Sequence, residues 1–317
     1  MKPEISVVIP ILSEEESISE LIARISEAFA KTRLSYEIIF IDDGSKDKTL
    51  ELLKKYSRDN KNISVYSFRR NMGKAIALTY GFQKAKGDYI VTMDADLQDD
   101  PENIGKMHEV IVSNNYDLVS GWRKNRKDST LKILNSKLFN RIIIPFMFNV
   151  KFNDMNSGLK IYKSDLAKEL KIYGGMHRFI PVIASQMGYE VFEAEIVHHS
   201  RKYGFSKFKS TKVFTDIPDL LTMFFLVKYN NRPLHFFSKL GGLLLFSGGI
   251  ILLYLIILKF FGESIGGRPL LIFGVLFVIA GIQTVFTGLL ADLMVNFNRK
   301  NMDEIPIKYK TSQNGKA

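Results

Sequence analysis

The sequence contains no cysteine, which excludes disulfide bonds and thiolate metal sites. No apolar run of signal-peptide length is found at its start, where residues 1–4 lead directly into a short strand pattern. The N-terminal part is therefore expected to lie in the cytoplasm. Turn residues are scattered rather than massed, and 46% of the residues are hydrophobic, so the composition does not predict disorder.

Acidic residues are in deficit, with 33 Asp and Glu against 44 Lys and Arg, for a formal net charge of +11. Such a balance favours an anionic partner, which means nucleic acid, a phosphorylated ligand or a membrane surface. The 317 residues can hold one large domain or a domain with an appendage. Because the C-terminal third is far more apolar than the rest, we expect the second arrangement.

Strand and helix patterns alternate along the N-terminal two thirds of the chain. Ser13 and the glutamates after it predict the cap of the first helix, and Asp47 is expected to open the second. The strands are apolar throughout, which favours a mostly parallel sheet covered by helices on both faces, an α/β fold. The predicted strands are 5–10, 36–41, 63–68, 89–93, 118–121, 159–162 and 191–197. The first predicted helix begins directly after Ser13 and has its apolar positions between 18 and 29, and the other predicted helices are 47–56, 74–84, 131–148 and 178–187.

Carboxylates follow two of these strands directly. Asp42 and Asp43 end the second strand, while Asp94, Asp96 and Gln98 follow the fourth. Ligands bind at the carboxyl ends of parallel strands, so both groups are expected in one crevice. Hard oxygen donors at this spacing suit Mg²⁺ or Mn²⁺. The alternative is a solvated turn before a capped helix, a role that we assign to Asp99 and Asp100.

Basic residues in two later stretches are candidates for binding phosphate. Arg123, Arg126 and Arg201 could pair with phosphate oxygens through the guanidinium fork, although each could instead be a solvated surface residue. Asp154 lies in a polar loop, where it could support a neighbouring group, act as a base or cap the loop. The adjacent His198 and His199 would point to opposite faces of a strand, so they are not expected to bind one metal together.

The chain becomes strongly apolar from residue 217 onward. Residues 217–229 suit a helix lying in a membrane interface, and 240–258 and 270–291 are each long enough to cross the hydrocarbon as a helix. Basic residues outside this pair outnumber Lys259 and Arg268 between them, which places both ends of the hairpin in the cytoplasm. The alternative is a buried hairpin of a soluble domain.

Taken together, these motifs resemble the family-two glycosyltransferases, and within them the polyprenyl-phosphate or dolichol-phosphate sugar synthases that have two C-terminal membrane helices. The resemblance covers nearly the whole chain. The matching segments, in the order of that family, are Pro10 with Glu14, then 41–45, 70–74, 93–98, 121–123, 157–160 and 201–208.

The resemblance implies a GT-A fold with a nucleoside-diphosphate sugar bound over a divalent ion, Mg²⁺ or Mn²⁺. The metal ligands would be Asp94, Asp96 and Gln98. Residues implied for the nucleotide sugar and the phosphates are Pro10, Glu14, Asp42, Asp43, Lys74, Asp94, Arg126, Ser206 and Lys207. Residues implied for catalysis are Asp94, Asp96, Arg123, Asp154 and Arg201. Leu12 and Ser13 replace a Tyr-Asn pair usual in the family, which leaves UDP and GDP donors both open.

We therefore expect inverting transfer of one sugar to a polyprenyl phosphate by a multi-pass protein of the cytoplasmic (inner) membrane. Its domains would be the GT-A domain 1–212, an interfacial helix and linker 213–235, the hairpin 236–298 and a cytoplasmic tail 299–317. A homo-oligomer is left open, and no nucleic acid is expected. The alternatives are a membrane synthase that extends a glycan chain and a non-enzymatic module that binds lipid.

Overall fold

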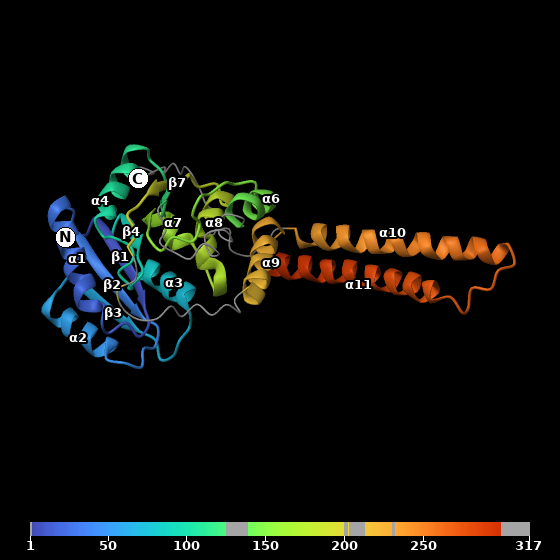
Figure 1. Ribbon diagram of the computed structural model, residues 1–317, viewed down its shortest axis with the longest axis horizontal. Coiled ribbons are helices and arrows are strands. Elements are labelled where there is room, and N and C mark those ends of the chain that lie inside the picture. Colours follow the sequence, from blue (N-terminus) through green and yellow to red (C-terminus); the bar gives the residue numbers. More distant parts are fainter. Residues whose placement is uncertain (1, 125–138, 200–201, 203–212, 230–231, 299–317) are drawn as a thin grey trace, which may run out of the picture. The chain divides into compact units, whose positions relative to one another are not determined.

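The structure is a computed structural model that describes residues 2–124, 139–199, 202, 213–229 and 232–298. Its internal contacts divide the chain into two compact units, Met1–Leu220 and Leu221–Ala317. The first unit contains the α/β part of the chain, and the second contains the long apolar helices (Figure 1). Each unit is described by itself below.

The centre of the first unit is a seven-stranded sheet among the residues described, in the order β3-β2-β1-β4-β6-β5-β7. Neighbouring strands are parallel except at β6, which is antiparallel to both β4 and β5. The expectation of a mostly parallel sheet is thus confirmed. The strands are β1 (Ile5–Ile11), β2 (Tyr36–Asp42), β3 (Ile63–Ser67), β4 (Tyr89–Thr92), β5 (Leu118–Trp122), β6 (Lys160–Lys163) and β7 (Val191–Glu195).

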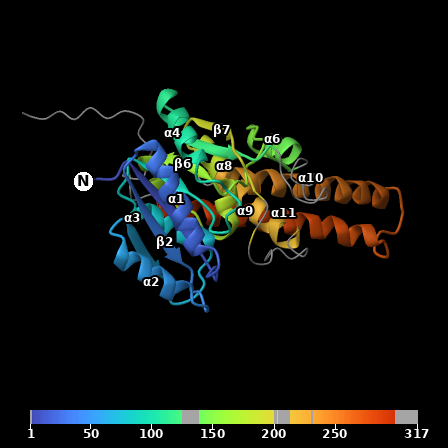
Figure 2. The same cartoon turned by 60° about the vertical axis from the view of Figure 1, so that its left-hand side comes forward.

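Helices cover both faces of the sheet, as the apolar strands require (Figures 1 and 2). Successive side chains of a strand point to opposite faces, so Val7 and Phe40 enter one hydrophobic core while Val8 and Ile39 enter the other. The first core is closed by α1 (Ile18–Thr32), α2 (Thr49–Asp59) and α4 (Asn103–Ser113). The second is closed by α3 (Lys74–Lys84), α7 (Ser164–Glu169) and α8 (Ile180–Gln186).

The start of the first helix differs from the sequence expectation. Ser13 does not cap it, because α1 begins only at Ile18. Ser13 has a left-handed backbone (φ 51°), and its N–H donates to Ser45 Oγ at 2.8 Å. The loop after β1 is therefore fastened to the loop after β2, and the glutamates belong to a turn. Asp47 does act at the start of α2, where its Oδ1 accepts from the Thr49 N–H at 3.1 Å.

Other boundaries shift for similar local reasons. The helix expected over 131–148 lies partly outside the described residues, and its described part is a π-helical turn, Phe139–Ile143, followed by the short helix α6 (Ile144–Phe148). The 3₁₀ helix η2 (Gly174–Phe179) precedes α8. Strand β7 ends at Glu195 rather than 197, because the Val197 N–H donates to the side-chain oxygen of Asn103 at 3.1 Å instead of continuing the strand ladder.

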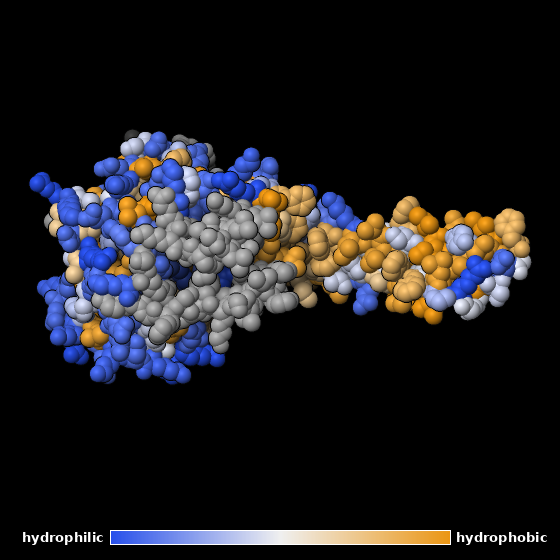
Figure 3. All heavy atoms as spheres, viewed as in Figure 1, coloured by the Kyte–Doolittle hydropathy of each residue, from blue (hydrophilic) through white to orange (hydrophobic). Residues whose placement is uncertain are grey.

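The second unit contains two helices that are long and apolar enough to cross a membrane, counted over the described part of the chain. They are α10 (Pro233–Phe260) and α11, which runs from Pro269 to Asn298 and is apolar enough over Pro269–Val295. Figure 3 shows their surface as mainly hydrophobic, whereas that of the first unit is mainly hydrophilic. Both are longer than the expected apolar cores. The helix α9 (Val213–Tyr229) precedes them, and ring contacts join its Phe225 to Phe236 and Phe237 of α10.

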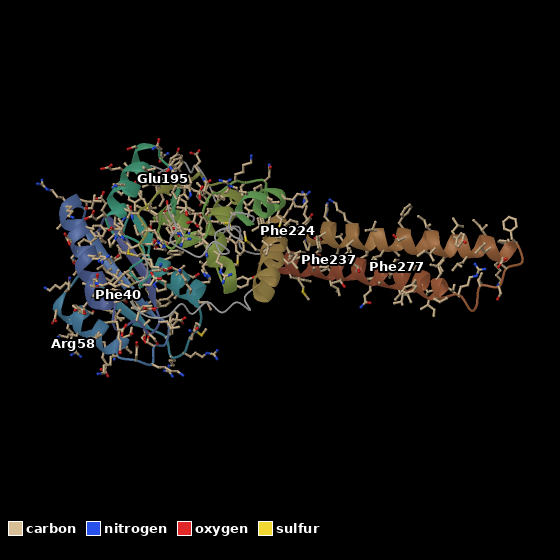
Figure 4. All side chains as sticks on the ribbon, viewed as in Figure 1. Phe40, Arg58, Glu195, Phe224, Phe237 and Phe277 are labelled. Carbon is tan, nitrogen blue, oxygen red and sulfur yellow. The ribbon has the colours of Figure 1, made fainter. Side chains whose placement is uncertain are left out.

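Glycines at seven-residue intervals let the two long helices approach closely. A Cβ on Gly281 of α11 would stand 2.7 Å from Leu245 Cγ and 2.8 Å from the Gly241 carbonyl oxygen of α10. One heptad later, Gly288 receives Phe237, whose position on α10 is labelled in Figure 4. Small residues at such spacing allow backbone contact between membrane helices, which favours a tightly packed hairpin.

Candidate functional site

The carboxyl ends of β1, β2 and β4 lie side by side in the sheet. Parallel pairing sets Pro10 of β1 beside Ile41 of β2, and Val8 beside Thr92 of β4. Asp42 and Asp43 at the end of β2 therefore reach the same edge as Asp94, which follows β4. Pro10 and Asp94 also line one small pocket, together with Lys74. Glu14 lies in the loop after β1, where its N–H donates to Thr49 Oγ1 at 3.0 Å.

Asp42 and Asp43 are both buried, and both fasten loops at this edge. Asp42 accepts from Ser67 Oγ at 2.6 Å and from the Ser45 N–H at 3.0 Å. Asp43 accepts from the backbone N–H groups of Met72 at 2.6 Å and Gly73 at 3.0 Å. Since these two residues immediately precede α3, the Asp43 carboxylate fixes the point at which that helix begins.

The first residue of α3, Lys74, forms an ion pair with Asp94. The Nζ to Oδ1 distance is 2.5 Å, and both side chains keep about a third of their surface exposed. Burial works to raise the pKa of Asp94, but the ammonium groups of Lys74 and Lys160 outweigh it and hold this pKa below its usual value. Asp94 is therefore an ionised carboxylate, and the cations next to it are the lysines Lys74 and Lys160.

The segment after Asp94 is a tight loop with an uncommon backbone. Leu97 is left-handed (φ 60°) and buried, while the Asp96 carboxylate accepts from the Gln98 N–H at 3.2 Å. Two hydrogen bonds tie this loop to the segment after β7: the His199 N–H donates to the Gln98 carbonyl at 2.7 Å, and Gln98 Nε2 donates to the His199 carbonyl at 3.4 Å.

The two adjacent histidines bind separate carboxylates. His198 Nδ1 lies 3.3 Å from Asp99 Oδ1 in a buried pair, and His199 Nε2 lies 3.0 Å from Asp100 Oδ2. The assignment of Asp99 as a helix cap was therefore wrong, since this carboxylate faces His198. Asp100 does act near the start of α4, where its Oδ1 accepts from the Glu102 N–H at 3.0 Å.

Arg123, which follows β5, and Asp154 form a buried bidentate pair. Arg123 Nε donates to Asp154 Oδ2 at 2.6 Å and Nη2 donates to Oδ1 at 2.9 Å. Nη2 also reaches the Asn156 carbonyl at 3.1 Å, and the Arg123 backbone N–H donates to the same carboxylate at 3.3 Å. The Asp154 carboxylate is thus engaged by Arg123, an arrangement suited to holding the guanidinium in place.

Two basic residues that line the pocket were not among the site residues assigned from the sequence. Lys160 of β6 is almost fully buried, and its ammonium donates to the Ser157 carbonyl. Burial, together with the charge of Lys74, lowers the pKa of Lys160 to about 8. His177 of η2 also lines the pocket, where burial and Lys74 lower its pKa to about 4, so this imidazole is neutral. Lys160 belongs to the segment 157–160 that matches the family, which was the available signal for it. His177 stands out in the sequence as a possible metal ligand, and a structural or headgroup contact is the preferred interpretation.

Oxygen donors suited to a divalent cation gather beside Asp94. Over the residues that the structure describes, no three His, Cys, Asp or Glu side chains form a ready metal cluster. Two carboxylate oxygens nevertheless converge at Gly158, where a Cβ would stand only 2.8 Å from Asp94 Oδ2 and 2.9 Å from Asp99 Oδ2. Hard cations prefer carboxylate oxygens as ligands, so the donor atoms of Asp94 and its loop fit Mg²⁺ or Mn²⁺.

Four of the predicted site residues, Arg126, Arg201, Ser206 and Lys207, lie outside the described residues. Of the others, the structure brings Pro10, Lys74 and Asp94 to one pocket. Asp42 and Asp43 lie at the end of the strand beside β1, and Arg123 and Asp154 are joined to each other.

Comparison with known proteins gives matches over most of the chain. Residues 6–170 match the model of the family "Glycosyl transferase family 2". Over 92% of its length the chain is 39% identical to a dodecaprenyl-phosphate galacturonate synthase of Rhizobium johnstonii, covering 87% of that protein. It is 35% identical to an undecaprenyl-phosphate 4-deoxy-4-formamido-L-arabinose transferase of Pectobacterium atrosepticum, with 91% and 87% of the two chains covered.

Among solved structures, the fold matches glucosyl-3-phosphoglycerate synthase of Mycobacterium tuberculosis. The complex with UDP gives a TM-score of 0.54 at 18% identity, over 71% of this chain and 80% of that one. A second structure of the same enzyme, with Mn²⁺ and UDP-glucose, gives a TM-score of 0.53. These matches confirm the expected GT-A fold.

Proposed function

Because the chain belongs to glycosyl transferase family 2, we propose that it transfers one sugar from a nucleoside-diphosphate sugar to a polyprenyl phosphate, with inversion, at a membrane surface. The observation that carries the proposal is the meeting of Asp43, Lys74 and Asp94 at one edge of the sheet, in a chain that also has two long apolar helices. The relatives named above, both described as acting on polyprenyl phosphates, support this acceptor class.

In the proposed reaction an oxygen of the lipid phosphate attacks the anomeric carbon of the donor sugar. The bond from that carbon to the diphosphate breaks, and the diphosphate leaves with the electron pair. The second pKa of a phosphate monoester is near 6, so the acceptor arrives mostly as a dianion and needs no general base. What it needs are cations that offset its repulsion from the donor.

Arg123 would supply such a cation. Asp154 and the Asn156 carbonyl engage three of its N–H groups, which fixes the plane of the guanidinium. A guanidinium carries two further N–H donors, on Nη1, in a geometry suited to phosphate oxygens. We assign Arg123 to phosphate binding, and Asp154 to holding it in place. Arg126, Arg201, Ser206 and Lys207 stay proposals for the same task from the sequence alone.

The donor would be held at the other end of the crevice. Asp43, with Asp42 beside it, is assigned to the nucleoside, with Pro10 and Glu14 lining its pocket and Lys74 near the diphosphate. Asp94 and Asp96, with Gln98, would hold Mg²⁺ or Mn²⁺. Such an ion would offset the negative charge that grows on the leaving diphosphate. The complex of the mycobacterial enzyme with Mn²⁺ and UDP-glucose supports a divalent ion and a UDP donor.

The apolar hairpin would anchor the enzyme in the inner membrane. The charge pattern favours both ends of the hairpin, and hence the catalytic unit, on the cytoplasmic side, where nucleotide sugars are available. As part of the same proposal, residues 213–235 would lie in the membrane interface. The tail 299–317 would be cytoplasmic.

The test is a transfer assay on the full-length protein in detergent. A panel of UDP- and GDP-sugars is incubated with undecaprenyl phosphate and Mg²⁺ or Mn²⁺, and the lipid products are analysed by mass spectrometry. We expect one sugar added per lipid phosphate, with release of the nucleoside diphosphate. Products with several added sugars would favour a glycan-chain synthase. Failure with every donor, despite lipid binding, would favour a lipid-binding module.

A further inference from the structure

We propose that Lys74 is a built-in cation that occupies Asp94 until the donor arrives, so that the divalent metal binds strongly only together with the donor diphosphate. This inference rests on the proposed function and deepens it. The inference concerns the order in which the metal and the donor bind. Neither the fold nor the choice of metal-binding residues determines that order.

The geometry that carries the inference is the contact between Lys74 and Asp94. The ammonium is held 2.5 Å from Oδ1, one of the two oxygens that a metal would use. A metal that takes both oxygens of this carboxylate must displace the ammonium. A metal that takes only Oδ2 must lie beside the ammonium, and their like charges repel. In either case the ion pair opposes binding of the free metal.

The donor diphosphate removes this opposition. Lys74 is the first residue of α3, with a flexible four-carbon stem and three N–H donors, so its ammonium can turn from Asp94 to a diphosphate oxygen without moving the helix. Asp43 fixes the backbone just before it, through Met72 and Gly73. The stem therefore starts from a fixed point, and only the side chain needs to move.

Other charges face Asp94, but they are differently placed. Lys160 comes from β6 and donates to the Ser157 carbonyl in a buried position, and the neutral His177 comes from η2. Gly158 lies close to Oδ2, with no room there for a Cβ. Lys74 keeps about a third of its side chain exposed, so it can exchange its partner, whereas Lys160 is too buried to do so without first losing its carbonyl contact.

The experiment measures Mn²⁺ binding to the full-length protein in detergent by electron paramagnetic resonance, without nucleotide and with UDP, or GDP if the transfer assay identifies a GDP-sugar. The variant is Lys74→Gln. The matched control is Lys84→Gln, which removes the same charge from the other end of the same helix, where the ammonium lies over Tyr66 and Tyr80. Thermal unfolding checks that both variants are folded. A third variant, Lys74→Arg, keeps the positive charge at this position and serves as a second control.

We expect Lys74→Gln to bind Mn²⁺ about fivefold more tightly than the wild type when nucleotide is absent, the scale of one partly exposed ion pair. Because coupling is reciprocal, the factor by which the nucleotide strengthens Mn²⁺ binding should shrink in this variant. Lys74→Arg and Lys84→Gln should match the wild type. Equal or weaker Mn²⁺ affinity in folded Lys74→Gln without nucleotide would overturn the inference.

The proposed function fails in a distinguishable way. If the wild type binds no Mn²⁺ even with nucleotide, the metal assignment itself is wrong, and the inference falls with it. If the wild type binds Mn²⁺ with equal strength in both conditions, the enzyme can still be a metal-dependent transferase, but Lys74 does not control entry. If Lys74→Gln does not fold, strong nucleotide-independent Mn²⁺ binding by the wild type would refute the inference on its own.

Discussion

The change Asp154→Asn removes the charge that holds Arg123 while keeping the shape of the side chain. Asp154 is 2% exposed and Arg123 is 12% exposed, so the pair is shielded from water. The carboxylate accepts three hydrogen bonds from Arg123, two from the guanidinium and one from the backbone N–H. Asparagine can accept with its oxygen, but its NH₂ group would face a guanidinium that also only donates.

Breaking a buried pair by removing one partner costs about 3–5 kcal/mol, because the other charge stays buried. Since Arg123 keeps some exposure and asparagine keeps one acceptor, we expect a loss of about 3 kcal/mol in the free energy of unfolding. For a unit of the size of Met1–Leu220 this corresponds to a fall in Tm of about 6–12 °C. The adjacent pair Lys124 and Glu195, at 2.7 Å but more than half exposed, is the control. Lys124→Met should cost less than about 1 kcal/mol.

The kinetic assay separates two roles for Asp154. If it positions Arg123, the KM for polyprenyl phosphate should rise in Asp154→Asn, and Arg123→Met should show the same defect. The double variant Arg123→Met with Asp154→Leu should regain stability without regaining acceptor binding, because no buried charge is left unpaired. A general base would show itself differently, as a fall of about 10²–10⁴ in kcat with an unchanged KM. A Tm within about 2 °C of the wild type would refute the energetic argument.

Three further changes test the donor side of the site. Asp43→Ala should weaken binding of the nucleoside diphosphate by about tenfold in calorimetry, the scale of one lost hydrogen bond to a charged group; unchanged affinity would remove Asp43 from the nucleotide site. Asp96→Asn should lower transfer by about a hundredfold at saturating Mg²⁺ or Mn²⁺ while leaving Tm unchanged, and wild-type turnover would contradict its role as a ligand. Gly158→Ala puts a Cβ 2.8 Å from Asp94 Oδ2, which requires this carboxylate to shift, so Mn²⁺ should bind about tenfold more weakly with nucleotide present; normal binding would show that the metal does not depend on the position of Asp94.

Much of the fold follows from local patterns. Strands that are apolar on both faces, such as β1 and β2, require helices on both sides, and this is what predicts the parallel sheet. The antiparallel placement of β6 between β4 and β5 could not be predicted, because a strand's neighbours depend on the path of the whole chain. The two long helices were foreseeable from their apolar length, but their close approach depends on which glycines meet, as at Gly241 and Gly281.

For the site, the sequence located the carboxylates and the resemblance pointed to Lys74, but neither showed which groups pair with each other. Asp94 and Asp43 were recognisable because carboxylates directly follow buried strands. Their partners Lys74 and Met72 come from a segment 20 to 29 residues away in the chain, so only the fold brings them together. The same reason explains the misassignment of Asp99: nothing near it in the sequence reveals His198, which is 99 residues away.

Leu97 shows how the loop that carries the metal candidates is held. Left-handed backbone costs a non-glycine residue about 1–2 kcal/mol, whereas burying a leucine side chain stabilises by about 1.5–3 kcal/mol. Leu97 has the left-handed backbone, with a φ of 60°, and its side chain is also buried, at 2% exposed. Glycine would adopt this backbone without strain, but it would leave the loop unanchored. The hydrophobic core therefore fixes the turn between Asp96 and Gln98, and the strain stays in the loop because the anchor outweighs it.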